Sequence, residues 1–148
     1  MWIKICGITD AATIAPLAAL RPDAVGFNFY RGSKRCITVE RAVEAARLLP
    51  DGIVPVGVFV NHSHDEIRSI CAATGITTVQ LHGDETPEFA AALKDFQVIR
   101  VFRLGADRLA PVAADLRTCR QFRLEPRACL VEPAVAGHYG GSGTTAPW

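Results

Sequence analysis

The chain has 148 residues, of which 49% are hydrophobic and 21% charged, and its formal net charge is +1. This size and balance suit one domain with a sizeable core, residues 1–148. The weak net charge excludes a general attraction to nucleic acid or to an acidic membrane surface. No apolar run approaches the roughly 20 residues that span a bilayer, so we expect a cytoplasmic protein without nucleic-acid or membrane partners.

Five cysteines are spread along the chain without a Cys-x-x-Cys pair: Cys6, Cys36, Cys71, Cys119 and Cys129. An odd number at wide spacing favours neither a disulfide framework nor a zinc site. We therefore expect reduced thiols, and no metal.

Apolar runs alternate with helical patterns along the chain. In chain order, we expect strands at 2–6, 23–29, 53–60, 77–81, 97–102 and 128–131, with helices at 10–20, 38–49, 63–73, 86–94 and within 107–119. The strands are too apolar to have a solvated face, and they recur about every 25 residues. This pattern predicts a parallel sheet built from βα units.

Two parallel α/β architectures fit this alternation: a (β/α)8 barrel of the TIM type and a doubly wound sheet. The Gly-x-Gly-x-x-Gly of a dinucleotide-binding sheet does not follow the first strand. Polar residues instead follow nearly every strand: Cys6, Asn28, Asn61, Gln80 with His82, Arg103 and Glu132. Such a ring at successive strand ends is typical of a barrel, and a full barrel needs about 200 residues or more. We expect about six βα units of an incomplete barrel.

Short motifs along the chain resemble the phosphoribosylanthranilate isomerase family of tryptophan biosynthesis. The matching segments begin with Lys4-Ile5-Cys6-Gly7 and continue, in the family's order, at 26–29, 33–35, 56–61, 79–85 and 140–143. The resemblance implies a TIM-barrel fold and an isomerase that uses acid and base catalysis without cofactor or metal.

The resemblance implies a catalytic role for two residues. Cys6 on its own is either a small buried hydrophobe or a reactive thiol at a Gly turn, and the family match makes it the general base. Glu132 stands where the family has an Asp that acts as general acid. Its carboxylate lies one methylene farther out, and Pro133 confines its backbone, so we expect a misplaced acid whose turnover Glu132→Asp would raise.

Substrate binding is implied for residues of three further motifs. Arg35 matches a loop arginine that faces the anthranilate group, although a solvated loop Arg is the commoner case. Gln80 and His82 match a Gln-Leu-His-Gly motif and could orient neighbouring polar groups. A Gly-rich loop can be a simple turn or can cradle phosphate with its backbone N–H groups. The family match favours phosphate for this loop, which consists of Gly140, Gly141, Ser142 and Gly143.

The implied reaction is an Amadori rearrangement of N-(5-phosphoribosyl)anthranilate to 1-(2-carboxyphenylamino)-1-deoxyribulose 5-phosphate. The match covers the whole chain but only about three-quarters of a typical member, whose last two βα units form the main phosphate site. We therefore expect self-association through open barrel edges. A non-catalytic remnant or interaction protein of the same fold is the alternative, and a cysteine-nucleophile enzyme with an unrelated substrate is a third possibility.

Overall fold

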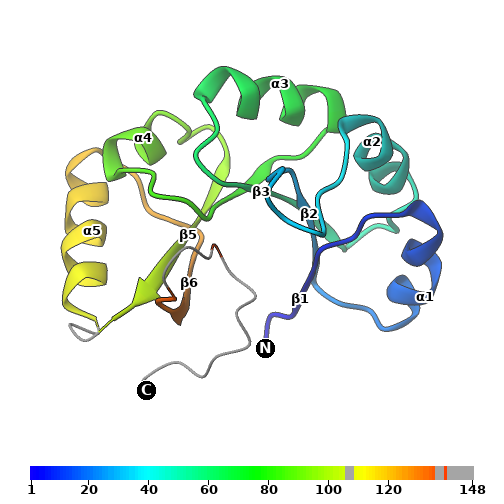
Figure 1. Ribbon diagram of the computed structural model, residues 1–148, viewed down its shortest axis with the longest axis horizontal. Coiled ribbons are helices and arrows are strands. Elements are labelled where there is room, and N and C mark those ends of the chain that lie inside the picture. Colours follow the sequence, from blue (N-terminus) through cyan, green and yellow to red (C-terminus); the bar gives the residue numbers. More distant parts are fainter. Residues whose placement is uncertain (106–108, 136–138, 140–148) are drawn as a thin grey trace.

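A computed structural model describes residues 1–105, 109–135 and 139 of the chain (Figure 1). Six strands form one parallel sheet in the order β1-β2-β3-β4-β5-β6. Their bounds are β1 Lys4–Cys6, β2 Ala24–Asn28, β3 Val54–Phe59, β4 Thr78–Leu81, β5 Gln97–Leu104 and β6 Ala128–Pro133. Each strand pairs with its successor in the chain, so all six carboxyl ends lie at the same edge of the sheet.

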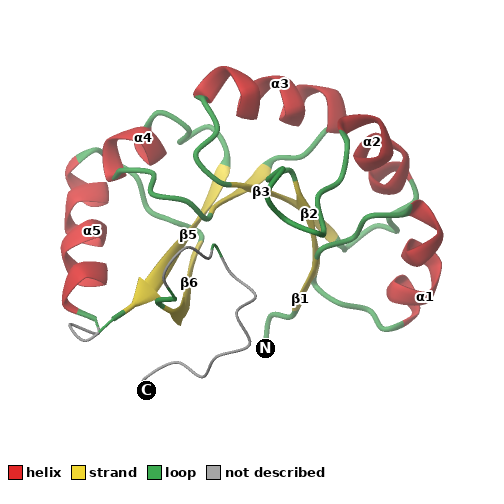
Figure 2. Cartoon of the chain, in the orientation of Figure 1, coloured by secondary structure: helices red, strands yellow, loops and turns green. Residues whose placement is uncertain are grey.

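The helices between the strands cover the outer side of the sheet. They are α1 Ile14–Ala19 after the short 3-10 helix η1 Ala11–Thr13, α2 Val39–Arg47, α3 His64–Thr74, α4 Pro87–Ala91 and α5 Ala110–Gln121. The sheet curls into a half-barrel, and the described helices lie on its convex side (Figures 1 and 2). A doubly wound sheet carries helices on both faces, so this arrangement confirms the barrel-type prediction. None of the helices described is long and apolar enough to cross a membrane.

Capping residues explain why the helices begin where the sequence predicts. The Asp10 carboxylate accepts a hydrogen bond from Ala12 N at 2.8 Å and starts η1. Ser63 and Glu66 form a reciprocal capping box at the start of α3. Gly75 then ends α3 in the left-handed region, with φ 74°.

The observed strand ends differ from the predicted ones where pairing, rather than hydrophobicity, sets the limit. β1 starts at Lys4 instead of Trp2, because residues 1–3 are exposed and precede the first paired position. β5 and β6 both run two residues farther than predicted, since Arg103 is in register with Glu132 and Leu104 with Pro133.

Alternation along the strands produces two apolar layers. Side chains on the convex face, such as Val25, Phe27 and Val79, are fully buried in the main core, which includes residues of the helices. On the concave face, Ala24, Val56 and Ile99 form a smaller cluster at the amino-terminal end of the barrel. Because side chains two residues apart share a face, the polar residues at the carboxyl ends of the strands stand directly above this small cluster.

A buried ion pair ties β5 to α5. Arg100 donates to the two carboxylate oxygens of Asp115 at 2.6 and 3.3 Å, and these side chains are only 5% and 17% exposed. A second pair, Arg68 with Asp95, has the same 2.6 Å separation but is 42% and 55% exposed. The two pairs therefore share their chemistry and differ in burial.

Removing the buried carboxylate should cost much more stability than removing the exposed one. Asp115→Ala leaves the buried Arg100 guanidinium without a counter-charge and should lower the free energy of unfolding by about 3–5 kcal/mol. Asp95→Ala should lower it by about 1 kcal/mol or less, because water screens that pair. Urea unfolding of both variants measures the difference, and equal losses would contradict the role given to burial.

Candidate active site

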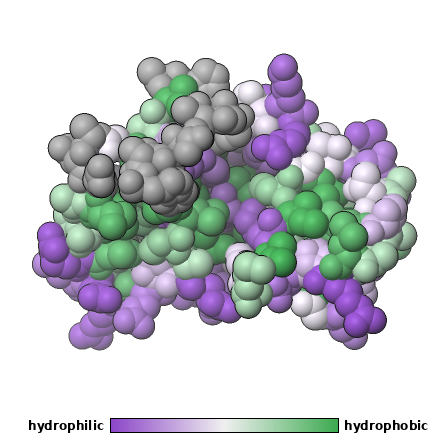
Figure 3. Space-filling view, turned by 90° about the horizontal axis from the view of Figure 1, so that it is seen from below, coloured by the Kyte–Doolittle hydropathy of each residue, from purple (hydrophilic) through white to green (hydrophobic). Residues whose placement is uncertain are grey.

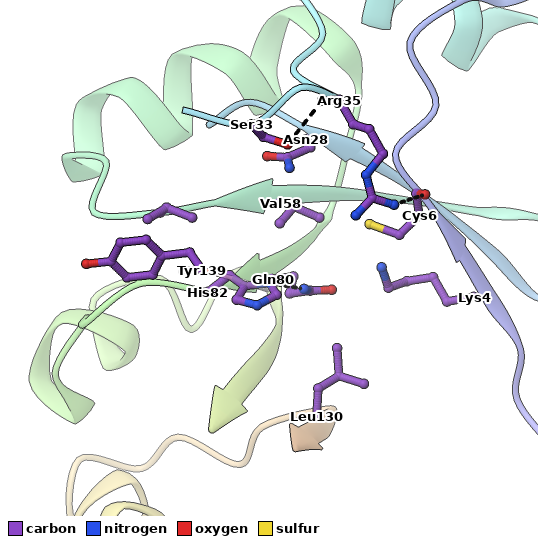
Figure 4. Close-up of a pocket in the computed structure, with 11 residues that line it drawn as sticks. Lys4, Cys6, Asn28, Ser33, Arg35, Val58, Gln80, His82, Leu130 and Tyr139 are labelled. Atoms are coloured by element: carbon purple, nitrogen blue, oxygen red, sulfur yellow. Dashed lines mark hydrogen bonds between the residues drawn. The ribbon is translucent and has the colours of Figure 1, made fainter. Parts of the chain in front are cut away.

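A pocket of about 270 Å³ lies on the concave side, at the carboxyl ends of the strands (Figure 4). Strands β1 to β4 and β6 all contribute to its lining. Among the predicted site residues, it brings together Cys6, Arg35, Gln80 and His82, which come from three separate βα units. Of the ring of polar residues expected from the sequence, Cys6, Asn28, Gln80 and His82 therefore line one space.

Cys6 ends β1, and its half-buried thiol lines the pocket. The next residue, Gly7, has φ 91°, a conformation that L residues rarely adopt. A Cβ on Gly7 would also lie 2.5 Å from Cδ of Arg35. Glycine thus allows Arg35 to cross over the turn and to donate from Nη1 to the Cys6 carbonyl oxygen at 3.2 Å.

Gly26 makes room for the Cys6 thiol on the neighbouring strand. Gly26 and Cys6 are in register, and a Cβ on Gly26 would lie 2.7 Å from Cys6 Sγ and 2.9 Å from Lys4 Nζ. The thiol and the ammonium group therefore share the space above this glycine. Lys4 is a functional candidate that the sequence analysis did not single out, although its two-residue spacing from Cys6 places both side chains on one face.

His82 joins Gln80 to Glu132. Its Nδ1 lies 2.9 Å from Nε2 of Gln80, and its Nε2 lies 3.1 Å from Oε1 of Glu132. The His82 and Glu132 side chains are 15% and 21% exposed, so this contact is largely shielded from water. Pro133 continues β6 in register with Leu104, which keeps Glu132 in the extended backbone predicted for it. Glu132 is thus connected to the pocket by its contact with His82, which lines it.

A second network of polar groups forms the rim beside the pocket. The Tyr139 hydroxyl donates to Asp84 at 2.6 Å, Asn61 Nδ2 lies 3.4 Å from the same carboxylate, and Arg103 is ion-paired with it. These bonds, with that of Tyr139 the strongest, hold the pKa of Asp84 below its usual value. The Arg103 guanidinium also lies 4.7 Å from the centre of the Tyr139 ring. The rim therefore links Arg103 at the end of β5 with the segments that follow β3, β4 and β6.

The predicted site residues fall into three groups. Four of them line the pocket, and Glu132 contacts the pocket through His82. The predicted phosphate loop, Gly140, Gly141, Ser142 and Gly143, lies outside the described residues. Sequence reasoning noted Asn61 and Arg103 as strand-end groups but missed Tyr139, because nothing in a lone loop tyrosine signals that it will bond to three distant segments.

Access and burial should separate the reactivities of the cysteines. Burial is the main cause that raises the pKa of Cys71 and of Cys119, each to about 11. At pH 8 both are neutral thiols away from the pocket, whereas the Cys6 side chain opens into it. Iodoacetamide at pH 8 should modify Cys6 at least tenfold faster than Cys71 or Cys119, since each pH unit below a thiol's pKa reduces its thiolate about tenfold. Peptide mass spectrometry measures the rates, and equal rates would contradict this burial pattern.

Comparison with known proteins gives a consistent match. The family model for N-(5'phosphoribosyl)anthranilate (PRA) isomerase matches residues 3–145. The N-(5'-phosphoribosyl)anthranilate isomerase of Methylibium petroleiphilum is 40% identical over 146 residues, which cover 99% of this chain and 65% of the relative. The enzyme of that name from Thermotoga neapolitana is 37% identical over 147 residues, which cover 99% and 67% of the two chains.

Solved structures agree with the sequence match. The crystal structure of phosphoribosyl anthranilate isomerase from Thermotoga maritima superposes with a TM-score of 0.76 at 30% identity, over 97% of this chain and 67% of that one. A phosphoribosyl anthranilate isomerase in complex with reduced 1-(o-carboxyphenylamino)-1-deoxyribulose 5-phosphate gives a TM-score of 0.72 at 31% identity, over 90% and 66% of the chains. This chain thus spans 65% of the length of the Methylibium relative, somewhat less than the three-quarters expected.

Proposed function

This chain belongs to the N-(5'-phosphoribosyl)anthranilate isomerase family, and from that premise we propose that it converts N-(5'-phosphoribosyl)anthranilate to 1-(2-carboxyphenylamino)-1-deoxyribulose 5-phosphate. The observation that carries the proposal is the meeting of a thiol, a guanidinium and a carboxylate-linked imidazole at one pocket: Cys6, Arg35 and His82 with Glu132. A relative with a phosphorylated product analogue in its crystal structure supports the substrate class.

Glu132 acts first in the proposed mechanism, as the general acid. It donates a proton to the furanose ring oxygen of the substrate, and the bond between that oxygen and C1 breaks. The lone pair of the anthranilate nitrogen forms a double bond to C1, which gives a protonated Schiff base. The carboxylate that remains on Glu132 keeps its hydrogen bond to His82, which stabilises the charge left on it.

Cys6 acts second, as the general base. Its thiolate removes the proton from C2, and the electrons of that bond form a C1–C2 double bond while the nitrogen becomes neutral. The resulting enolamine gains at C1 the proton that Cys6 holds and gives its C2 hydroxyl proton to Glu132, which yields the ketone and restores both side chains to their starting states. The atoms of substrate and product balance, so the sequence of steps requires no redox partner.

Arg35 is the proposed partner of the anthranilate carboxylate. Its guanidinium has five N–H donors in a plane, and one nitrogen, Nη1, is held by the Cys6 carbonyl. That bond fixes the orientation of the plane and leaves other donors for a carboxylate. The same bond keeps the bound substrate close to the thiol of Cys6.

We further propose that residues 1–148 act as one domain that associates with itself through β1 and β6. Within the described residues, each of these strands pairs on one side only. Trp2 and Ile3 beside β1 and Leu130 on β6 are exposed. Seen toward the open side of the arc, hydrophobic residues gather on both flanks (Figure 3). Unpaired strand edges of this kind attract further strands.

The proposed location of the protein is the cytoplasm. The five free cysteines suit the reducing conditions there.

Replacing the proposed base should remove the activity. Cys6→Ser should lower turnover by about 10²–10⁴-fold, because a hydroxyl is a far weaker base than a thiolate. Cys129→Ser is the matched control, since Cys129 is exposed and on the opposite face of its strand from Glu132. Steady-state kinetics and growth of a tryptophan auxotroph that lacks this step measure the effect. Failure of the unchanged chain in both assays would favour the non-catalytic alternative.

Replacing the proposed acid tests the contact with His82. Sequence alone predicts that Glu132→Asp raises turnover, but the 3.1 Å contact favours the opposite sign. One methylene less withdraws the carboxylate from His82 by about 1.5 Å, which breaks the hydrogen bond. We expect Glu132→Gln to lower kcat about 10²–10⁴-fold and Glu132→Asp to lower it by a smaller factor. A higher kcat in Glu132→Asp would support the misplaced acid instead.

A further inference from the structure

The amide nitrogen of Gln80 has a hydrogen-bond partner among the described residues, and its amide oxygen has none. The side chain is 2% exposed and lines the pocket. Its Nε2 lies 2.9 Å from His82 Nδ1, whereas no protein group in the described part of the chain bonds to its Oε1. A buried acceptor left without a hydrogen bond is unfavourable, so this oxygen is a favourable partner for a donor that enters the pocket.

The groups beside Gln80 on the sheet do not supply that donor. On the adjacent strands its register partners are Val58 and Ile99, and both side chains are buried hydrocarbon. His82, the next residue on the same face, already uses Nδ1 toward Gln80 and Nε2 toward Glu132. The direction that remains for Oε1 is the pocket itself, which Gln80 lines.

The contacts of His82 fix which way the amide points. If Gln80 Nε2 donates to Nδ1, the neutral imidazole carries its proton on Nε2 and donates it to the Glu132 carboxylate. If the amide were reversed, Nδ1 would carry the proton, and the lone pair of Nε2 would face the lone pairs of Glu132. With a neutral ring, and with the proton that Glu132 gives to the substrate held on Oε2, the oxygen that does not contact His82, only the first arrangement makes both contacts favourable. The amide oxygen is therefore the atom directed away from His82, on the side of the pocket lining, where it is buried in the structure as it stands (Figure 4).

We propose that Gln80 links substrate recognition to the placement of the acid, and this inference rests on the proposed function. Its amide nitrogen fixes the His82 tautomer that holds Glu132, and its amide oxygen accepts a hydrogen bond from a hydroxyl of the phosphoribosyl group. The anthranilate N–H is the other donor of the substrate, but it bonds internally to the ortho carboxylate, so the sugar hydroxyls are the donors available. Gln80 is accordingly a binding residue through Oε1 and a positioning residue through Nε2.

Nitrogen NMR on the histidine-labelled free protein tests the positioning half without any substrate. The signal of His82, assigned by its loss in His82→Gln, should show the proton on Nε2. Gln80→Met, which is close in shape but forms no such bond, should give a mixture of tautomers. Gln80→Glu should move the proton to Nδ1, because the new carboxylate accepts there. An unchanged ring signal in both variants, with urea unfolding confirming that they fold, would overturn this half.

Calorimetry with reduced 1-(o-carboxyphenylamino)-1-deoxyribulose 5-phosphate tests the binding half. Analogues that lack the C2 or the C3 hydroxyl are the comparison ligands. One of them should bind the unchanged chain about 10–100-fold more weakly than the parent, since the buried acceptor then stays unbonded. Gln80→Met should bind this analogue and the parent equally.

The outcomes of the two experiments are separable. Discrimination that persists in Gln80→Met overturns the hydroxyl contact while leaving the proposed function in place. Absence of binding to the unchanged chain overturns both the hydroxyl contact and the proposed function. The tautomer result decides the positioning half in either case, because it comes from the free protein.

Discussion

The in-register parallel pairing of six strands determines where every functional group lies. Cys6 stands opposite Gly26, Val58 opposite Gln80 and Arg103 opposite Glu132. Side chains alternate between the two faces, so a slip of one residue would turn any of these strands inside out. The apolar contacts of the convex face with the helices resist such a slip. Packing on one side of the sheet thus fixes the chemistry on the other.

Small residues next to the reactive groups are the second requirement of this arrangement. Gly26 leaves space for both the Cys6 thiol and the Lys4 ammonium, and Gly7 lets Arg35 pass over the turn that follows β1. A Cβ at either position would meet side-chain atoms at 3 Å or less. The glycines therefore bring the thiol of Cys6 and the guanidinium of Arg35, which come from different βα units, to one pocket.

Local rules predict much of this fold because the relevant forces act over a few residues. The capping box of Ser63 and Glu66 and the left-handed Gly75 mark the ends of α3 in the sequence itself. Strand-end polar groups were also recognisable, since the period of βα units locates the strand ends. The contact between His82 and Glu132 spans fifty positions and depends on side-chain reach, so no local pattern signals it. The contacts of Tyr139 with Asp84 and Arg103 could not be predicted from the sequence for the same reason.

Glu132 shows how a one-methylene departure from a family pattern can be accommodated. The extended backbone before Pro133 fixes the start of the side chain, so the extra methylene moves the carboxylate by about 1.5 Å. An unanchored carboxylate displaced by that distance would be poorly aligned with a substrate. Here the longer side chain ends 3.1 Å from the imidazole of His82, and Gln80 holds the ring from the other side. The position of the Glu132 carboxylate is then set by Gln80 of β4 and His82 after it, as well as by its own strand, so the effect of the longer side chain depends on these two residues.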